Sequence, residues 1–399
     1  MEQQTLMTRC YSMKIGINTY FFKFPASGSG QYLLHLLQAL AEVDQENKYI
    51  LLGPHPISEK TGTLIKFPHV VTPVPRLARR NASIENLVWE QFSAPSAARK
   101  ANVDLFHIPY FAPPFFPRSP GVITIHDVIP LRLPEYRTDP KMKAYLQLIM
   151  RAAHKATLII TISQHAKHDI IDALKLPAER IRVIYEAAGD EYQPINDSEV
   201  LAKMRARYGL NDRYILYLGG LDLRKNVPQL VRAFAHLYQQ MGDPKLQLMI
   251  AGKPDKLGRA LFPDPRPVAA DLGITDHVVY RFIEEEDKPA IYSGASVFVF
   301  PSLYEGFGLD PLEAMKCGAP VLCSNRTSLP EVVGDAAISF DPDNMREMVQ
   351  DMHSVLTNNE LQADLRARSL KRAAQFNWRK TAIETISVYQ EAYLRSKKK

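Results

Sequence analysis

Short apolar runs alternate with segments of helical periodicity along the chain, and this alternation constrains the fold more than any other feature. The run at 14–18 is followed by a loop with two glycines and then by leucines at helical spacing. Further apolar runs that we expect to be strands lie at 48–52, 104–107, 122–126, 157–162, 214–220, 246–251 and 296–301. Since strands that alternate with helices form parallel sheets covered on both faces, we predict an α/β fold.

The length of the chain suits two such units. Its 399 residues are 46% hydrophobic and 23% charged, an ordinary balance for globular domains. The polar stretch 188–200, which has no clear period and contains Pro194, is the expected linker. We therefore predict one domain at 1–190, a second at 191–376, and a C-terminal helix with a basic tail at 377–399 that crosses back to the first domain.

Ligands of parallel α/β sheets bind beyond the carboxyl ends of the strands. We therefore expect functional residues in the loops after Asn18, Ile125, Leu218 and Phe300. Among the helices expected around these loops, one should begin near Gln164 with Ser163 as its cap. Others are expected near 228–241, 311–317, 344–357 and 377–395.

Positive charge is concentrated in the first half of the chain. Residues 1–190 contain 22 Lys and Arg against 16 Asp and Glu, whereas residues 191–399 contain 27 of each. Attraction to an anionic acceptor or membrane surface and simple solubility both stay open as explanations. No dense basic stripe with interleaved aromatics occurs, which argues against nucleic acid as a partner.

Cysteine spacing and hydropathy bear on the compartment. Cys10, Cys317 and Cys323 show no CxxC spacing, so we expect free thiols in a reducing compartment. No apolar stretch is long enough for a bilayer, and the first residues lack the core of a secretion signal. We expect a cytoplasmic protein, soluble or bound at the inner face of the membrane. The basic helix expected at 141–155 either lies on a membrane or packs on the core with a solvated side.

Two loops combine features that suit a diphosphate. Gly28 and Gly30 stand directly before a helix, where the backbone can approach a ligand closely and the helix start offers amides. The two glycines do not complete the GxGxxG fingerprint of dinucleotide-binding loops, and an ordinary strand-to-helix turn is the alternative. Arg224 and Lys225 lie between an apolar strand and Pro228, which fits the first turn of a helix. These two cations either bind phosphate or remain solvated.

Further candidates are acidic residues and one histidine. Glu305 and Glu313 flank a glycine-containing loop, and Pro311 predicts a helix start that would place Glu313 in the first turn. Carboxylates accept hydrogen bonds from paired sugar hydroxyls, whereas a favourable interaction with the helix dipole is the alternative for Glu313. His126 and Asp127 end a strand at the edge where ligands bind. No protease triad and no histidine cluster for a metal is recognisable.

Together these sites resemble glycosyltransferase family 4, the retaining enzymes with the GT-B fold, over residues 13–395. The stretch 305–313 is similar to the E-x7-E signature of that family, and 314–321 and 328–337 continue the likeness. The loop 219–226 is similar to its G-x-L-x-x-R-K-N element. The resemblance implies two Rossmann-like domains whose parallel sheets face across a cleft. It also implies a nucleotide-diphosphate sugar as co-substrate and no other cofactor.

The resemblance implies roles for individual residues. Arg224 and Lys225 would hold the donor diphosphate and stabilise the leaving group, while Glu313 would bind the ribose. Glu305 would orient the transferred sugar, assisted by the amides of Phe307, Gly308 and Leu309. The residues that would act from the first domain are Gly28 and Gly30 on the phosphates, His126 on the donor sugar and Asp127 on the acceptor side. Two residues depart from the family pattern, Asp310 and Ile283, and the second puts the base pocket in doubt.

The resemblance further implies retention of the anomeric configuration and no metal requirement. The sequence offers no clear nucleophile on the opposite face of the sugar, so same-face attack is favoured. The stretches 86–91 and 126–131 look like bacterial mannosyltransferases that build surface polysaccharides, and GDP-mannose is the preferred donor over UDP-glucose or UDP-GlcNAc. A glycan or lipid-linked acceptor is expected. The alternatives are a non-catalytic nucleotide-sugar-binding subunit or sensor, and an epimerase or phosphorylase on the same architecture.

Overall fold

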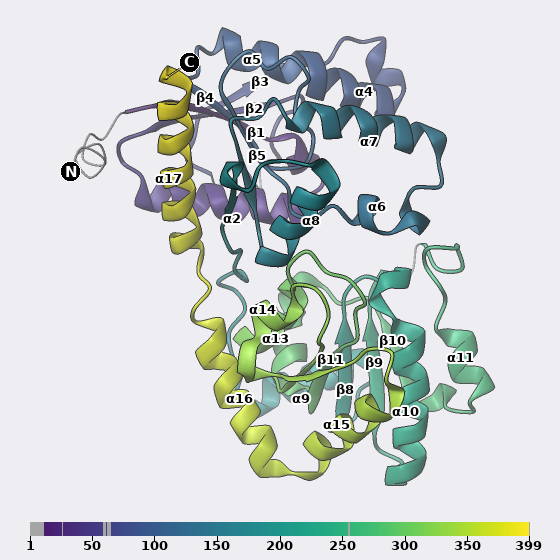
Figure 1. The fold of residues 1–399 in the computed structure, drawn as a ribbon. Helices are drawn as coiled ribbons and strands as arrows, with labels where there is room; N and C mark the ends of the chain where they lie inside the picture. The colour runs from purple at the N-terminus through teal and green to yellow at the C-terminus, as the bar shows by residue number, and fades with distance from the viewer. Residues whose placement is uncertain (1–11, 26, 59–60, 62–64, 254–255, 399) are drawn as a thin grey trace. The chain divides into compact units, whose positions relative to one another are not determined.

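The computed structural model describes residues 12–25, 27–58, 61, 65–253 and 256–398. The chain forms two compact units (Figure 1), of which unit 1 spans 1–186 and 378–399, and unit 2 spans 187–377. Each unit contains one sheet of parallel strands. The prediction of an α/β fold with two Rossmann-like domains is therefore confirmed, as is the return of the C-terminal helix to the first of them.

The described part of unit 1 has a seven-stranded sheet in the order β3-β2-β1-β4-β5-β6-β7. Its strands are β1 (Lys14–Asn18), β2 (Lys48–Gly53), β3 (His69–Val71), β4 (Leu105–Ile108), β5 (Gly121–Thr124), β6 (Leu158–Thr161) and β7 (Ile181–Val183). β1 pairs with β2 on one side and with β4 on the other, so the strand order reverses between β1 and β4. Loops that leave such a switch point diverge and open a crevice at the carboxyl edge.

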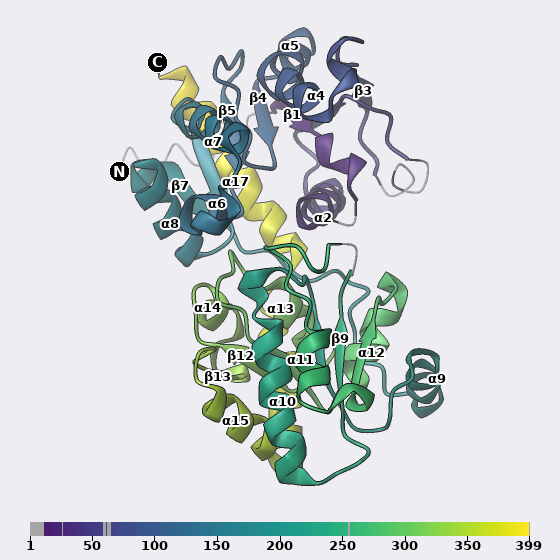
Figure 2. The ribbon, with the colours of Figure 1, turned by 90° about the vertical axis from the view of Figure 1, so that its right-hand side faces the viewer.

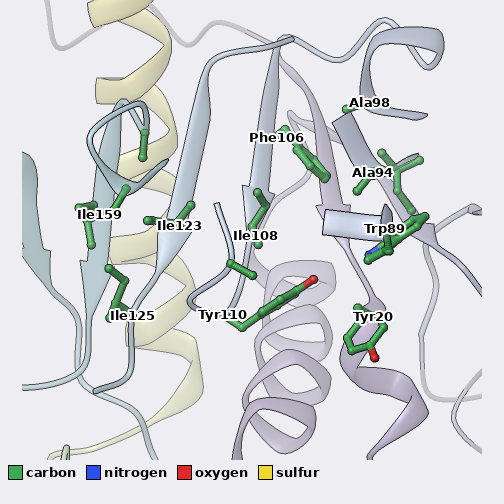
Figure 3. Packing of buried hydrophobic residues seen from close by; sticks show 14 of the residues in the cluster. Tyr20, Trp89, Ala94, Ala98, Phe106, Ile108, Tyr110, Ile123, Ile125 and Ile159 are labelled. Carbon is green, nitrogen blue, oxygen red and sulfur yellow. The ribbon is translucent and has the colours of Figure 1, made fainter. Parts of the chain in front are cut away.

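Helices cover both faces of this sheet. They are α2 (Gly28–Val43), α4 (Ala82–Val88), α5 (Ala94–Lys100), α6 (Ile129–Arg132), α7 (Pro140–Ala153), α8 (Gln164–Leu174) and α17 (Trp378–Lys397). The core on one face contains side chains from α5, α7 and α8 packed on the sheet. Figure 3 shows part of this core, with Phe106 and Ile108 of β4 beside Ile123 and Ile159 of the next two strands.

The opposite face of the unit 1 sheet carries α2 and α17, which pack against each other. Because side chains alternate along a strand, His107 points away from the face that Phe106 and Ile108 share. Its Nδ1 lies 2.7 Å from Tyr389 Oη of α17, and its Nε2 lies 2.9 Å from Thr124 Oγ1. Burial lowers the pKa of His107 to about 3, so this buried network is neutral.

The described part of unit 2 has a six-stranded sheet in the order β10-β9-β8-β11-β12-β13, with helices on both faces (Figure 2). Its strands are β8 (Tyr214–Leu218), β9 (Gln247–Ala251), β10 (Val278–Arg281), β11 (Val297–Phe300), β12 (Val321–Ser324) and β13 (Ile338–Phe340). Its helices are α9 (Ser198–Tyr208), α10 (Val227–Met241), α11 (Arg266–Asp271), α12 (Lys288–Gly294), α13 (Leu309–Lys316), α14 (Leu329–Val333), α15 (Met345–Thr357) and α16 (Asn359–Ala373). The contacts group α10 with α11 and α15, and α13 with α12 and α16.

Local sequence signals explain where several helices begin and end. Ser163 accepts a hydrogen bond from the backbone N–H of Ala166 and so caps α8, as predicted. Pro228 lies in the first turn of α10, and Gly242 ends that helix in the left-handed conformation. The expected linker at 188–200 overlaps the start of α9, because Asp197 caps a helix there by accepting from the N–H groups of Glu199 and Val200.

Candidate active site

Two loops of unit 2 leave the carboxyl ends of neighbouring strands. The loop 219–226 follows β8 and the loop 301–308 follows β11, and these two strands pair directly. Since β9 and β12 flank them on the outer sides, the strand order reverses between β8 and β11. The loops with Arg224, Lys225 and Glu305 therefore meet at the switch point of the sheet, where α/β proteins bind ligands.

Arg224 is held by partners from both loops. Its Nη1 lies 2.6 Å from Glu305 Oε2 and donates a hydrogen bond to Tyr304 O at 2.9 Å. Its Nε lies 3.1 Å from Asp222 Oδ1 on its own loop. The side chain is 17% exposed, so the guanidinium is fixed in orientation and still reaches solvent.

Lys225 is buried and lies between two carboxylates. Its Nζ is 2.8 Å from Glu305 Oε1 and 3.2 Å from Asp310 Oδ2. The ammonium also lies 4.5 Å from the centre of the Phe300 ring at the end of β11. Burial alone would lower the pKa of Lys225, but the charges of Glu305 and Asp310 outweigh it and raise the pKa above its usual value. The ammonium is therefore charged at neutral pH.

Glu305 joins the two cations. Besides the ion pairs to Arg224 and Lys225, its Oε1 accepts a hydrogen bond from Ser302 Oγ at 2.6 Å, and its backbone N–H donates to Thr327 Oγ1 at 3.0 Å. Burial would raise the pKa of this carboxyl, but Lys225 and Arg224 lower it to about 2. Glu305 is thus a fixed anion over the whole physiological range.

Ser328 holds the glycine-containing loop after Glu305 in place. Ser328 Oγ lies 2.9 Å from the carbonyl oxygen of Glu305 and 2.6 Å from that of Phe307. Gly308 has φ of 135°, and a Cβ there would lie 2.9 Å from Leu329 Cδ2, so only glycine fits without movement. α13 begins immediately after this residue, with its first amides at the edge of the loop.

The prediction that α13 begins at Pro311 was wrong by two residues. The helix begins at Leu309, because the positive φ of Gly308 turns the chain into the helix earlier. Glu313 therefore lies in the second turn, where a side-chain interaction with the helix dipole is weaker than in the first turn. The alternative explanation for Glu313, a favourable interaction with the helix dipole, therefore loses its main support.

Glu313 has a different environment from Glu305. Tyr292 Oη donates a hydrogen bond to its Oε2 at 3.2 Å. Burial, together with the negative charge of Asp310, raises the pKa of Glu313 to about 8 despite the opposing charge of Lys288. The two carboxyl groups of the E-x7-E stretch thus differ, because the pKa of Glu305 is lowered and that of Glu313 is raised.

The two residues that depart from the family pattern are both placed in unit 2. Asp310 pairs with Lys225, and its Oδ2 lies 3.1 Å from where a Cβ of Gly219 would stand, so its carboxylate points toward the cation loop. Ile283 follows β10 and is 3% exposed. The side chain that departs from the family pattern is therefore buried.

Gly28 and Gly30 open α2 in unit 1, and they differ in what surrounds them. Gly28 is the first residue of the helix, and a Cβ there would meet nothing within 4 Å. A Cβ at Gly30 would lie 2.4 Å from the carbonyl oxygen of Phe24, so this position excludes a side chain. The backbone N–H of Gly30 donates to Ser27 Oγ, which caps the helix.

His126 and Asp127 lie just beyond β5 in the same unit. The His126 ring stands edge-on to Tyr32 with ring centres 4.8 Å apart, and burial lowers the pKa of His126 to about 4. The imidazole is therefore neutral. Asp127 Oδ1 accepts a hydrogen bond from the backbone N–H of Ile129 at 3.0 Å, which fixes the turn into α6.

Glu186 is a residue that the sequence reasoning did not single out. It follows β7 at the end of unit 1 and is 6% exposed. Burial and the nearby charge of Asp127 raise its pKa to about 8. Its position just before the polar stretch taken as a linker gave no signal of burial.

The structure thus gathers the predicted residues into two groups. Arg224, Lys225, Glu305 and Glu313 lie in unit 2 on loops and a helix that share one edge of the sheet, with 307–309 between the carboxylates. His126 and Asp127 lie together in unit 1, and Gly28 and Gly30 open the helix that carries Tyr32.

Several expectations about other features can be set against the described residues. Cys317 and Cys323 are buried free thiols, while Cys10 lies outside the described part of the chain. α7 buries Leu146 and Ile149, so its apolar side packs on the core. In the described ranges, no group of three or more His, Cys, Asp or Glu is placed to hold a metal. None of the helices there has the length and hydropathy needed to cross a bilayer.

Family comparisons assign both units. Residues 26–188 match the family described as Glycosyltransferase Family 4, and residues 202–372 match Glycosyl transferases group 1. The chain belongs to these glycosyltransferases. The two matches cover most of unit 1 and unit 2 respectively, and the second contains Arg224, Lys225, Glu305 and Glu313.

Two curated proteins to which this glycosyltransferase is similar are mannosyltransferases of Escherichia coli. The serotype-specific mannosyltransferase WbdA is 34% identical over 267 residues, which are 65% of this chain and 32% of WbdA. The enzyme therefore aligns with about a third of the length of WbdA. The O-antigen chain mannosyltransferase B is 29% identical over 393 residues, which are 95% of this chain and 100% of that protein.

Solved structures share the fold of this glycosyltransferase. Sucrose-phosphate synthase from Thermosynechococcus elongatus superposes with a TM-score of 0.73 at 20% identity, covering 96% of this chain and 100% of that one. The Anabaena protein HepE, solved with UDP and glucose, gives a TM-score of 0.72 at 20% identity, with 95% and 99% covered. At these identities the likeness establishes the GT-B fold alone.

Proposed function

We propose that this glycosyltransferase moves mannose from GDP-mannose, with retention of configuration, to a glycan or lipid-linked acceptor in the synthesis of a cell-surface polysaccharide. Two relatives named as mannosyltransferases support mannose, and the name of one of them, an O-antigen chain mannosyltransferase, supports the polysaccharide. The observation that carries the catalytic part is the cluster in which Glu305 joins Arg224 and Lys225 at the switch point of the unit 2 sheet.

Charge stabilisation is the main contribution of this cluster. When the bond between sugar and diphosphate breaks, negative charge develops on the phosphate oxygens and positive charge on the sugar ring. Arg224 presents a planar, partly exposed fork to the phosphates, and Lys225 adds a second positive charge behind it. The first amides of α13 point toward the same edge. One preorganised donor of this kind is commonly worth about 3 kcal/mol in the transition state.

Glu305 is suited to orienting the sugar rather than attacking it. Both of its carboxylate oxygens are engaged by cations, and the low pKa shows how strongly the anion is stabilised. A carboxylate held in this way is a poor nucleophile and a poor base. This favours attack of the acceptor on the same face of the sugar, with a leaving phosphate oxygen taking the acceptor proton. The anomeric configuration is then retained.

Arg224 and Lys225 supply the positive charge that a divalent ion supplies in other transferases, so we propose that turnover needs no metal. The donor base is the least supported part of the proposal. The Anabaena neighbour was solved with UDP, so a uridine donor is the competing choice.

A donor screen tests the proposed function. Purified protein is incubated with GDP-mannose, UDP-glucose or UDP-GlcNAc and a panel of mannose-containing acceptors, and nucleoside diphosphate release is measured with and without EDTA. GDP release that depends on acceptor and survives EDTA supports the proposal. Binding of a nucleotide sugar without turnover would favour the non-catalytic subunit, and donor conversion without acceptor would favour an epimerase.

The cation pair is tested in the same assay. Arg224→Ala and Lys225→Ala should each lower turnover about a hundred-fold, because each removes one charge from the leaving group. Lys245→Ala, at an exposed position just before β9, serves as the control. If either variant keeps the turnover of the unchanged protein, the substituted residue does not stabilise the leaving phosphate.

A further inference from the structure

The chain places Glu186 at the carboxyl edge of the unit 1 sheet by a series of backbone bonds. The N–H of Ile184, just past β7, donates to Thr161 O at 2.8 Å. The carbonyl of Tyr185 accepts from Thr381 Oγ1 of α17 at 2.7 Å. The residue that follows is therefore fixed on the same sheet edge as His126 and Asp127, which follow β5.

His126 and Glu186 both lie near Tyr32 of α2, and Asp127 lies near Glu186. Burial and the charge of Asp127 raise the pKa of Glu186 to about 8, and burial, with a smaller contribution from the charge of Glu186, raises the pKa of Tyr32. The Tyr32 ring meets His126 at 4.8 Å with an angle of 89° between the rings. Tyr32 is 1% exposed and its hydroxyl lies 3.4 Å from Thr124 Oγ1, so its ring is a buried neighbour of His126.

Two polar groups in this cluster lack a hydrogen-bond partner in the described part of the protein. Glu186 is only 6% exposed, and its carboxyl group lies near the charge of Asp127 without a hydrogen bond or ion pair to any described residue. The buried Nε2 of His126 likewise has no hydrogen-bond partner in the part of the chain that the structure describes. Buried polar groups are nearly always paired, and an unpaired one destabilises the fold. Its retention is explained by a ligand that supplies the missing partners.

We propose that Glu186, together with Asp127, binds hydroxyl groups of a hexopyranose in unit 1. This inference rests on the proposed transferase function, which supplies a sugar for the site. Two neighbouring carboxyl groups accept hydrogen bonds from adjacent ring hydroxyls, and a protonated Glu186 also donates one. A metal ion fits less well, because no group of three or more ligating side chains exists in the described residues. The sugar is either the acceptor or the transferred residue, and both present the same hydroxyl chemistry.

Two substitutions and one matched control separate binding from folding. Glu186→Ala removes the group, whereas Glu186→Gln keeps its shape and prevents ionisation. Glu179→Gln changes an exposed glutamate beside the amino end of β7, at the opposite edge of the sheet. Thermal unfolding is measured at pH 8 for all three. If the Glu186 carboxyl stabilised the fold, its replacement would lower the unfolding temperature of the protein. We instead expect Glu186→Gln to unfold at a higher temperature than the unchanged protein, because a buried charge is removed.

Kinetics then identify the sugar. For Glu186→Ala we expect the acceptor KM to rise about ten-fold or more while calorimetric affinity for GDP-mannose stays unchanged. If instead acceptor-free hydrolysis of GDP-mannose falls and the acceptor KM does not move, the site binds the transferred sugar. A change in neither quantity beyond that of Glu179→Gln overturns the proposal, and so does a loss of thermal stability in Glu186→Gln.

The pH dependence gives an independent readout. The charged and titratable groups around Glu186 are Asp127 and Tyr32, with His126 neutral above pH 4. Ionisation of Glu186 adds a second negative charge beside Asp127, so sugar binding should weaken between pH 7 and pH 9 in the unchanged protein. The Gln variant should show no such change, and an identical profile in both would contradict the inference.

Failure of the transferase assay does not decide whether Glu186 binds a sugar. If the unchanged protein neither binds nor turns over a nucleotide sugar, the proposed function fails. Saturation-transfer NMR with α-linked mannobiose still compares the unchanged protein with Glu186→Ala. Equal signals from the two proteins, or no signal from either, would reject the Glu186 site.

Discussion

The charges around the donor loops are nearly balanced at the level of single residues. Arg224 and Lys225 face three carboxylates, those of Asp222, Glu305 and Asp310, at ion-pair distances of 2.6 to 3.2 Å. Under the proposed function, a diphosphate that enters this site would have to displace a carboxylate from a cation rather than occupy a free basic pocket. The affinity for nucleotide would then depend on how tightly those carboxylates hold the cations.

Asp310→Asn should increase the affinity for nucleoside diphosphate. The substitution removes the charge 3.2 Å from Lys225 Nζ, and a part-buried pair of this kind is worth on the order of 1 kcal/mol, which corresponds to several-fold in affinity. Calorimetric titration with GDP and UDP measures the effect. Asp364→Asn, which changes an exposed i,i+4 pair on α16, is the control. Unchanged or weaker binding would show that Asp310 does not compete with phosphate.

Glu313→Gln should stabilise the ligand-free protein at pH 8 and have little effect near pH 4.5. The folded-state pKa of Glu313, about 8, lies above the ordinary value of 4.5. Its contribution to stability is therefore fully present below pH 4.5 and is lost as the pH rises toward 8. Each pKa unit between the two states corresponds to about 1.4 kcal/mol. Urea unfolding at both pH values, with Glu360→Gln on the exposed surface as control, measures the difference. An equal gain at both pH values would contradict the raised pKa.

At the level of elements, the sequence predicts the interior of each sheet better than its edges. β8 and β11 are continuous apolar runs at the centre of their sheet, and both were expected. The edge strands β3, β7 and β13 have three residues each and were not expected, and neither were the edge strand β10 and the interior strand β12. A three-residue strand is too short for a hydrophobic period, and its pairing depends on neighbours distant in sequence.

The candidate site was predictable where a loop carries its own signal. Arg224, Lys225, Glu305 and Glu313 stand in recognisable spacings, and the parallel sheet brings their loops to one edge. Glu186 has no such spacing, and the backbone just before it is bonded to Thr381 of α17, which lies about two hundred positions later. The start of α13 was also missed, because the φ of 135° at Gly308 is a property of the folded loop.

Gly308→Ala should impair catalysis more than it impairs folding. A Cβ at this position would lie 2.9 Å from Leu329 Cδ2 in a backbone conformation that disfavours side chains, which costs on the order of 1–3 kcal/mol. Relief of that strain moves the start of α13 and the loop that holds Glu305.

The matched control for Gly308→Ala is Gly242→Ala. Gly242 also has a positive φ, of 61°, but it ends α10 in open space with nothing within 4 Å of its Cβ. Turnover and urea unfolding are measured for both variants. Comparable losses of turnover at comparable stability would mean that the position of α13 does not matter for catalysis.

At the level of the whole molecule, the segment that ends the chain is part of the unit that begins it. α17 packs against α2 and contacts β4, β5 and β6. His107 and Tyr389, which join the strand to the helix, are 282 positions apart in sequence. Unit 2, by contrast, is formed from one continuous segment, 187–377.

Tyr389→Phe should destabilise unit 1 selectively. The loss of the hydroxyl leaves the buried Nδ1 of His107 without its partner at 2.7 Å, which costs about 1–3 kcal/mol. Scanning calorimetry with and without GDP-mannose separates the units if unit 2 binds this ligand as proposed, since bound ligand would raise the transition of that unit. Tyr393→Phe, one turn further along α17 and less buried, is the control. A shift in the ligand-sensitive transition alone would contradict the assignment.

The return of α17 also determines the order in which the protein can acquire its structure during synthesis. The strands of unit 1 are synthesised before unit 2, yet the face that α17 covers stays open until residues 378–397 have been added. Unit 2 is complete by residue 377 and can fold while unit 1 still lacks α17. A nascent chain stalled just before that helix would expose an apolar face that chaperones bind.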